Sequence, residues 1–358
     1  MNPAIPNIVI VGAGLTGLTT AYLLKKVGIK ATIIEARPRI GGRIHTRYQE
    51  GEAPFELGAT WLGQKHQYIN TLLKELDLPI HEQALGKTAI YEYLSTSPHQ
   101  LVQLPPNTDP SYRIKGGSSV LIQRLAAELE AEQLQLGQVV QSIAFKENNI
   151  DIQTNKASFQ ATQVITTLPP NLLVSSITFS PALPTNVVEL AKNTHTWMGE
   201  SIKVGFTFPE AFWKTDQLSG TIMSNVGPIG EMYDHSNKVA TQFALKGFLN
   251  DAFHAASKEE RQKIALLQLR KYYGEKADSF TAYVECVWRK EPYTFTAYED
   301  SIMPHQNNGH PLLRAPLMDG QLIIAGSETA TNFPGYMDGA VQSAYNVLNI
   351  LTPEFQNS

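Results

Sequence analysis

The hydrophobic residues near the start of the chain form two short runs, separated by a segment with a different spacing. Residues 8–11 are a β-branched run that ends at a glycine-rich turn, and residues 31–35 form a second run of this kind. Between them, residues 15–26 carry apolar side chains at helical intervals. This order predicts a strand, a helix and a second strand within about 30 residues, the usual size of a βαβ unit that binds a nucleotide.

The middle of the chain alternates between patterned and unpatterned segments. Residues 83–111 are rich in Pro, Ser, Thr and Tyr without strong periodicity, so we expect an excursion out of the first domain there. A helix is predicted to begin at Ser118 or Ser119, whose hydroxyl would accept a free backbone N–H group. The remaining predicted elements are strands at residues 150–153, 161–166, 230–233, 240–244, 282–288 and 321–325, and helices at residues 258–272 and 335–351.

Residues 201–208 show the clearest alternation in the chain. Ile202, Val204 and Phe206 alternate with Lys203 and more polar or smaller residues, which predicts a half-buried strand. The lysine is therefore expected on the opposite face of the strand from the isoleucine. On the basis of periodicity alone, we expect that face to be exposed to solvent.

The composition narrows the class of protein. A length of 358 residues suggests about two domains, and the formal charge of -4 without long runs of like charge gives no surface for nucleic acid. The single cysteine, Cys286, excludes an intrachain disulfide and a cluster of thiolate metal ligands. We therefore expect no metal site and no nucleic-acid partner.

The apolar stretch at residues 8–24 is the only segment that resembles a membrane or signal sequence. No basic residue precedes it, lysines follow it, and Gly12, Gly14 and Gly17 interrupt it. The last six residues, 353–358, are polar and show no anchor. We expect a cytoplasmic protein without a membrane partner.

The glycines of that first turn have the spacing Gly-x-Gly-x-x-Gly, after a strand and at the start of a helix. The N–H groups at the helix N-terminus can then approach a pyrophosphate, and Glu35, 21 residues beyond Gly14, can bind ribose hydroxyls. The alternative is that the glycines serve only close packing of strand and helix. This motif by itself does not distinguish NAD from FAD.

The residues after Glu35 do make that distinction. The segment Ala36-Arg-Pro-Arg-Ile-Gly-Gly-Arg43 resembles the family of flavin-containing amine oxidases. The resemblance implies that Gly42 and Arg43 lie against the FAD diphosphate, where an arginine fork supplies charge; the alternative is a solvated basic loop. Similar family segments follow in order at residues 56–63, 116–118, 140–143, 168–170, 326–330 and 335–340.

The resemblance implies an α/β fold with a Rossmann-type FAD-binding domain and a discontinuous α+β substrate domain built on a mixed sheet. We expect the FAD-binding domain to comprise residues 1–75, 112–190 and 289–358, and the substrate domain residues 76–111 and 191–288. The residues expected to contact FAD are Gly12, Ala13, Gly14, Leu15, Thr16, Gly17, Glu35, Ala36, Arg37, Gly42, Arg43, Gly58, Ala59, Thr60, Trp61, Val140, Trp288, Ser327, Glu328, Gly335 and Met337.

Three further residues are implied as catalytic. Lys203 matches the family lysine that holds a water against flavin N5, and Tyr336 and Phe295 match two aromatic rings that flank the amine. The alternatives are a surface lysine and plain core packing. Residues 292–295 contain no cysteine where some relatives attach the flavin covalently, so FAD is expected to be non-covalent. The excursion between Gly63 and Gly116 is shorter than in mitochondrial monoamine oxidases, which implies a reduced helical part of the substrate domain.

The expected function is FAD-dependent oxidation of an amine. Hydride from the α-carbon reduces flavin N5, the imine hydrolyses to an aldehyde or ketone, and O2 becomes hydrogen peroxide. The nine histidines are scattered, and His45, His66 and His235 are interpreted as surface or supporting residues. The alternatives are an FAD-dependent dehydrogenase or desaturase acting on a C–C bond and a catalytically silent flavin-binding interaction protein. The sequence is compatible with a homodimer but does not establish the oligomeric state.

Overall fold

A parallel sheet of five strands lies at one end of the computed structural model, which describes residues 7–147, 149–215 and 218–353. The polar residues 354–358 lie outside the described residues. The strand order is β10 (Leu134–Leu136), β2 (Ala31–Glu35), β1 (Ile8–Val11), β14 (Gln163–Thr166) and β21 (Leu322–Ile324). The predicted strand–helix–strand unit is confirmed, with α1 spanning Leu15–Lys26.

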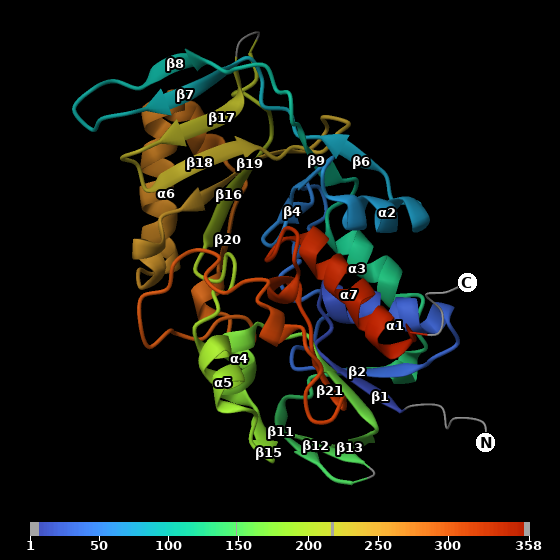
Figure 1. Cartoon of the computed structure of the whole chain (residues 1–358). Helices are drawn as coiled ribbons and strands as arrows, with labels where there is room; N and C mark the ends of the chain where they lie inside the picture. The colour runs from blue at the N-terminus through green and yellow to red at the C-terminus, as the bar shows by residue number, and fades with distance from the viewer. Residues whose placement is uncertain (1–6, 148, 216–217, 354–358) are drawn as a thin grey trace.

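The two faces of this sheet are covered differently because its strand residues alternate. Ile8 and Ile10 pack toward the helices on one face, whereas Val9 and Val11 pack toward a second sheet. The helices on the first face are α1, α2 (Gln67–Glu75), α3 (Ser119–Ala126) and α7 (Met337–Leu351). The second sheet has the order β13 (Ser158–Ala161), β12 (Ile150–Thr154), β11 (Val140–Phe145) and β15 (Thr178–Ser180). Figure 1 shows this second sheet below the first.

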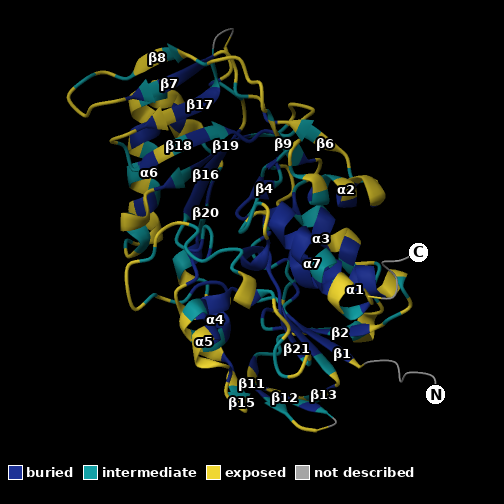
Figure 2. Cartoon of the chain, in the orientation of Figure 1, coloured by how far each residue is buried: buried dark blue, intermediate teal, exposed yellow. Residues whose placement is uncertain are grey.

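A mixed sheet of seven strands forms the other half of the molecule (Figure 1). Its order is β20 (Ala282–Val287), β16 (Ile202–Phe208), β19 (Phe243–Leu249), β18 (Ile229–Asp234), β17 (Leu218–Ser224), β7 (Thr88–Glu92) and β8 (Gln100–Gln103). Helix α6 (Lys258–Tyr273) packs on one face through Ala265 and Leu269. Figure 2 shows β16 buried and the outward turns of α6 exposed.

Smaller elements connect the two halves. Helices α4 (Pro170–Ser176) and α5 (Thr185–Lys192) pack on each other beside β15. Two small sheets pair β3 (Thr46–Arg47) with β4 (Phe55–Glu56), and place β9 (Ser111–Ile114) between β5 (Leu62–Gly63) and β6 (Ile80–Glu82). Among the described residues, no helix has the length and apolarity needed to span a membrane.

Several expectations about elements are corrected. No strand was predicted in residues 83–111, where an excursion out of the first domain was expected, but the structure contains β7 and β8 there. Strand β8 is mostly exposed and bounded by glutamines, so it carries little periodic signal. The predicted strand at 240–244 lies at 243–249, since residues 237–242 form a turn closed by Asn237. No serine side chain caps α3. The carboxylate of Glu56 accepts from the Ser118 N–H instead, and the Ser119 hydroxyl accepts from the Thr46 N–H.

Candidate active site

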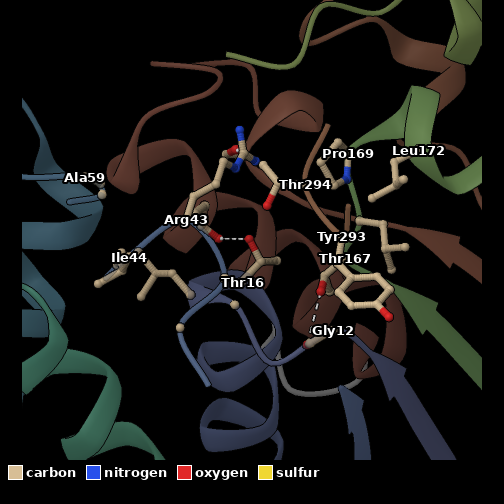
Figure 3. A pocket seen from close by; sticks show the side chains of 18 of the residues that line it. Gly12, Thr16, Arg43, Ile44, Ala59, Thr167, Pro169, Leu172, Tyr293 and Thr294 are labelled. Atoms are coloured by element: carbon tan, nitrogen blue, oxygen red, sulfur yellow. Dashed lines mark hydrogen bonds between the residues drawn. The ribbon is translucent and has the colours of Figure 1, made fainter. Parts of the chain in front are cut away.

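A cavity of about 530 Å³ lies between the carboxyl ends of β1 and β2 and the seven-stranded sheet. This end of a parallel α/β sheet is the usual location of a ligand. Of the residues predicted as a site, all line this cavity except Ala13, Gly17, Glu328 and Phe295. Figure 3 shows Gly12, Thr16, Arg43, Tyr293 and Thr294 around it, with the Thr167 hydroxyl donating to the Gly12 carbonyl at 3.2 Å.

The presence of glycine at the three positions of the first turn does not have a single physical reason. A Cβ atom on Gly12, whose φ is +108°, would lie 2.6 Å from the Thr167 hydroxyl, and one on Gly17 would overlap the Gly12 carbonyl oxygen. A Cβ on Gly14 would meet no atom within 4 Å. Gly12 and Gly17 therefore serve close packing, whereas Gly14 leaves open space at the helix N-terminus that faces the cavity.

Glu35 closes the same turn from the end of β2. Its carboxylate accepts from the backbone N–H groups of Ala13 and Arg37, each at 2.8 Å. The side chain is buried but still lines the cavity. Arg37 in turn bonds the Thr294 hydroxyl at 2.8 Å and pairs with Glu291 at 3.1 Å, so it fixes the loop that follows β20.

The guanidinium of Arg43 is paired with a buried carboxylate. Its guanidinium makes a bidentate ion pair with the fully buried Glu328 and a bond of 2.9 Å to the Ser327 hydroxyl. Burial raises the pKa of Glu328, but the charge and hydrogen bonds of Arg43 outweigh it and hold that pKa below its ordinary value. Arg43 therefore lines the cavity with its charge already balanced within the protein, and its contact with the FAD diphosphate stays a prediction.

The loop at residues 58–61 passes between the two halves of the molecule. Glycine is required at position 58, because a Cβ there would overlap the Arg43 carbonyl oxygen. The Gly58 carbonyl accepts from the Lys203 ammonium, and the indole N–H of Trp288 donates to the Leu57 carbonyl at 2.9 Å. These bonds tie the loop to the end of the seven-stranded sheet.

Lys203 lies on the face of β16 that is turned toward this loop, opposite the Ile202 face. Its side chain is 5% exposed, so the alternative of a solvent-facing lysine is wrong. Burial lowers the pKa of Lys203 to about 8, against the opposing effect of Glu56. The amine also lies 5.1 Å from the centre of the Phe248 ring, which lines the same cavity.

The aromatic pair differs from the one expected. Tyr336 lines the cavity and is 37% exposed, but the ring beside it is Trp197, at 5.5 Å between centroids and 31° between planes. Phe295 is buried away from the cavity, where it packs edge-on against Tyr298 at 5.6 Å and beneath the guanidinium of Arg289. The expected slot between Phe295 and Tyr336 is not formed among the described residues.

Several residues in or beside the cavity were missed from the sequence, among them Trp197, Glu231 and Lys246. Trp197 precedes the strand and carries no periodic signal, and Glu231 lies on β18 beside the expected strand core. Lys246 is fully buried on β19, beyond the end of the strand predicted there. Its position between Leu245 and Gly247 could have been found by extending the alternation of residues 243–249.

The chain is similar to known proteins over most of its length. The family model described as flavin containing amine oxidoreductase matches residues 15–107 and 99–347. A probable flavin-containing monoamine oxidase A of Dictyostelium discoideum is 26% identical over 459 aligned positions, which cover 98% of each chain. An amine oxidase of Oncorhynchus mykiss is 25% identical and covers 94% of this chain and 84% of its own length.

Solved structures share the fold. A putrescine oxidase bound to putrescine superposes with a TM-score of 0.85 at 22% identity, over 97% of this chain and 99% of its own. A cyclohexylamine oxidase from Brevibacterium oxydans gives a TM-score of 0.85 at 19% identity, over 98% and 99%. The mixed α/β architecture with a parallel sheet and a separate mixed sheet is thereby confirmed.

Proposed function

Because this chain belongs to the family of flavin-containing amine oxidoreductases, we propose that its cavity holds FAD non-covalently and admits an amine for oxidation at the carbon next to nitrogen. The observation that carries the proposal is the continuity of the cavity. It runs from the glycine turn and Glu35 to Lys203 and Tyr336, so one elongated dinucleotide can reach both ends.

The residues at the nucleotide end fit FAD. The open space beside Gly14 leaves room for a phosphate at the N-terminus of α1, where the helix dipole and N–H groups favour negative charge. Of the three arginines in the following segment, Arg37 and Arg43 already have carboxylate partners, Glu291 and Glu328, and Arg39 donates to two backbone carbonyls of its own loop. A diphosphate would therefore be held mainly by backbone donors, with Glu35 and Val140 toward the ribose and adenine.

Bound there, FAD would supply the hydride acceptor for the amine α-carbon and the route of the electrons to O2. The protein contributes position and charge. Trp197 and Tyr336 offer two ring faces that stabilise partial positive charge on an amine. The buried ammonium of Lys203 can orient a water or an oxygen species at the far end of the cavity.

A specific observation favours diamines among the substrates. Glu231 is a half-buried carboxylate on the wall formed by the seven-stranded sheet, and it accepts from the Tyr233 hydroxyl at 2.6 Å. A cationic group far from the reacting carbon could pair with it. A structural neighbour with 22% identity is a putrescine oxidase bound to putrescine, a diamine. This supports the second ammonium of a diamine as the group that pairs with Glu231.

We also propose the division into an FAD-binding domain (residues 1–75, 112–190 and 289–358) and a substrate domain (residues 76–111 and 191–288). The pairing of β7 with β17 supports it, because this pairing joins residues 88–92 to the sheet built from residues 202–287.

Anaerobic mixing of the purified yellow protein with a panel of amines tests the function. Bleaching of the flavin band by amines, followed by peroxide formation when air is admitted, is the expected result. A protein that takes up FAD but is not reduced by any amine would favour a dehydrogenase or desaturase for C–C bonds, or a silent flavin-binding protein. A protein that takes up no FAD contradicts the whole proposal.

A further inference from the structure

A second lysine lies beside Lys203 in a fully buried position. Lys246 is on β19, where its register partner on β16 is Gly205, and it shares the cavity-facing side of the sheet with Lys203 and Phe248. Its amine donates to the Thr60 hydroxyl and lies 4.4 Å from the centre of the Trp61 ring. In the part of the chain that the structure describes, it makes no ion pair with a carboxylate.

The two lysines and the loop at residues 58–61 form a connected set of hydrogen bonds. The Gly58 carbonyl accepts from Lys203 and, at 3.1 Å, from the Thr60 hydroxyl. That hydroxyl accepts from Lys246, so the two amines bind neighbouring acceptors of the same loop. Each amine therefore fixes the position of the other relative to the cavity wall.

The surroundings do not accommodate two positive charges. Burial lowers the pKa of Lys246 well below its ordinary value, and the neighbouring Lys203 and Arg113 lower it further, with Glu56 opposing. Two adjacent buried amines share protons as a pair, and one of them must remain neutral. Lys203 lines the cavity and donates to a backbone carbonyl, whereas Lys246 is completely buried and does not line the cavity, so Lys203 is the amine that keeps the proton. The other titratable groups that influence this pair from neighbouring elements are Glu231, His235 and Cys286.

We propose that Lys246 is a positioning residue for Lys203: it remains an uncharged amine, accepts a hydrogen bond from the Lys203 ammonium, and holds that ammonium against the Gly58 carbonyl at the cavity wall. This inference rests on the proposed function, in which Lys203 acts beside the flavin. Lys246 itself does not line the cavity. Its effect on any reaction passes through Lys203.

The direction in which the pKa of Lys203 changes when Lys246 is replaced distinguishes this role from its alternatives. If Lys246 is a neutral acceptor, its removal takes a hydrogen bond from the charged form of Lys203 and lowers the pKa of Lys203. If Lys246 were cationic, its removal would relieve repulsion and raise that pKa. If Lys246 only filled space, an isosteric apolar side chain would leave it unchanged.

The experiment is an NMR titration of protein labelled with ¹³C at the lysine ε-carbons, both without cofactor and loaded with FAD. The Lys203 signal is assigned as the one that disappears in Lys203→Met. In Lys246→Met we expect the pKa of Lys203 to fall by about one unit, the effect of losing a hydrogen bond to a charged group. In Lys246→Gln the amide oxygen restores an acceptor, and most of the shift should be reversed. Lys65→Met, which removes an exposed lysine, is the matched control.

An unchanged or raised pKa of Lys203 in Lys246→Met overturns the inference. If Lys246→Met does not fold, Lys246→Leu takes its place with the same expected fall in the pKa of Lys203, and an unchanged or raised pKa overturns the inference. Failure of the proposed function has another signature. In that case no amine reduces the flavin, or Lys203→Met is reoxidised at the wild-type rate, while the titration still decides whether the lysines are coupled.

Discussion

Arg43 and Glu328, 285 residues apart in sequence, form a bidentate ion pair with N···O distances of 2.5 and 2.8 Å. The pair joins the loop after β2 to the turn after β21, and the ring of Tyr336 follows a few residues later. The Glu328 side chain is fully buried, while a quarter of the Arg43 side chain remains exposed at the cavity. This contact therefore links the nucleotide end of the cavity to the segment that carries its aromatic residue.

Removing either partner of this pair should be costly because the other charge remains buried. We expect Glu328→Ala or Arg43→Met each to lower the free energy of unfolding by about 3–5 kcal/mol, measured by urea denaturation. The double variant should lose less than the sum of the two single losses. Strictly additive losses would show that the two side chains are not energetically coupled.

The same pair gives a pH dependence with a defined sign. The pKa of Glu328 is lowered in the folded state, so its contribution to stability is present above the unfolded pKa and is lost as the pH falls through the folded pKa. The free energy of unfolding should therefore decrease more steeply toward acid in the wild type than in Glu328→Gln. Equal slopes for the two proteins below pH 4.5, the ordinary value for this group, would contradict this.

Gly14 and Gly17 offer a matched pair of substitutions. Gly17→Ala should destabilise the fold by about 2–3 kcal/mol, because its Cβ would overlap the Gly12 carbonyl oxygen. Gly14→Ala should keep the stability within about 1 kcal/mol, since its φ of −76° is accessible to alanine and the added atom meets open space. It should nevertheless weaken FAD binding by about tenfold or more, as measured by fluorescence titration. Unchanged FAD affinity in Gly14→Ala would place the phosphate elsewhere.

Lys203 should control the reaction with oxygen. Lys203→Met is expected to slow reoxidation of the reduced flavin on the order of a hundredfold while FAD remains bound. In the wild type the reoxidation rate should fall as the pH rises through about 8, because the buried ammonium loses its proton there. Stopped-flow reoxidation at several pH values measures both effects. A pH profile that persists in the variant would assign the ionisation to another group.

The aromatic residues inside and outside the cavity lead to different predictions. Trp197→Leu and Tyr336→Leu should raise the KM for amines roughly fivefold, because each ring contributes a face to the cavity. Phe295→Leu should leave the KM unchanged but lower the free energy of unfolding by about 1 kcal/mol, as expected for a buried ring outside the cavity. A changed KM in the Phe295 variant would restore the role that the sequence first suggested.

Glu231 should discriminate between amines with one and two cationic groups. Glu231→Gln is expected to raise the KM for putrescine on the order of tenfold or more, the value of one charge-assisted hydrogen bond. Butylamine, of equal chain length but without the second amine, is the matched substrate and should change little. Equal effects on both substrates would remove Glu231 from recognition of the distal ammonium.

Local sequence patterns alone were sufficient to predict the first strands and helix and part of the candidate site. The bounds of β1, α1 and β2 follow from β-branched runs and helical spacing, and the glycine turn with Glu35 follows from the geometry of a helix N-terminus. These signals are local, because backbone sterics and periodic burial act between residues close in sequence. The family resemblance added Lys203 and Tyr336, both of which line the cavity.

Only the tertiary structure decided which side chains meet. The partner of Arg43 is Glu328, the ring beside Tyr336 is Trp197 rather than Phe295, and Lys246 packs beside Lys203 from a neighbouring strand. Strand alternation places Lys203 on one face but cannot say whether water or protein covers that face. Here the loop at residues 58–61 covers it. Such contacts depend on sheet register and on how distant segments pack, which no spacing within a single segment encodes.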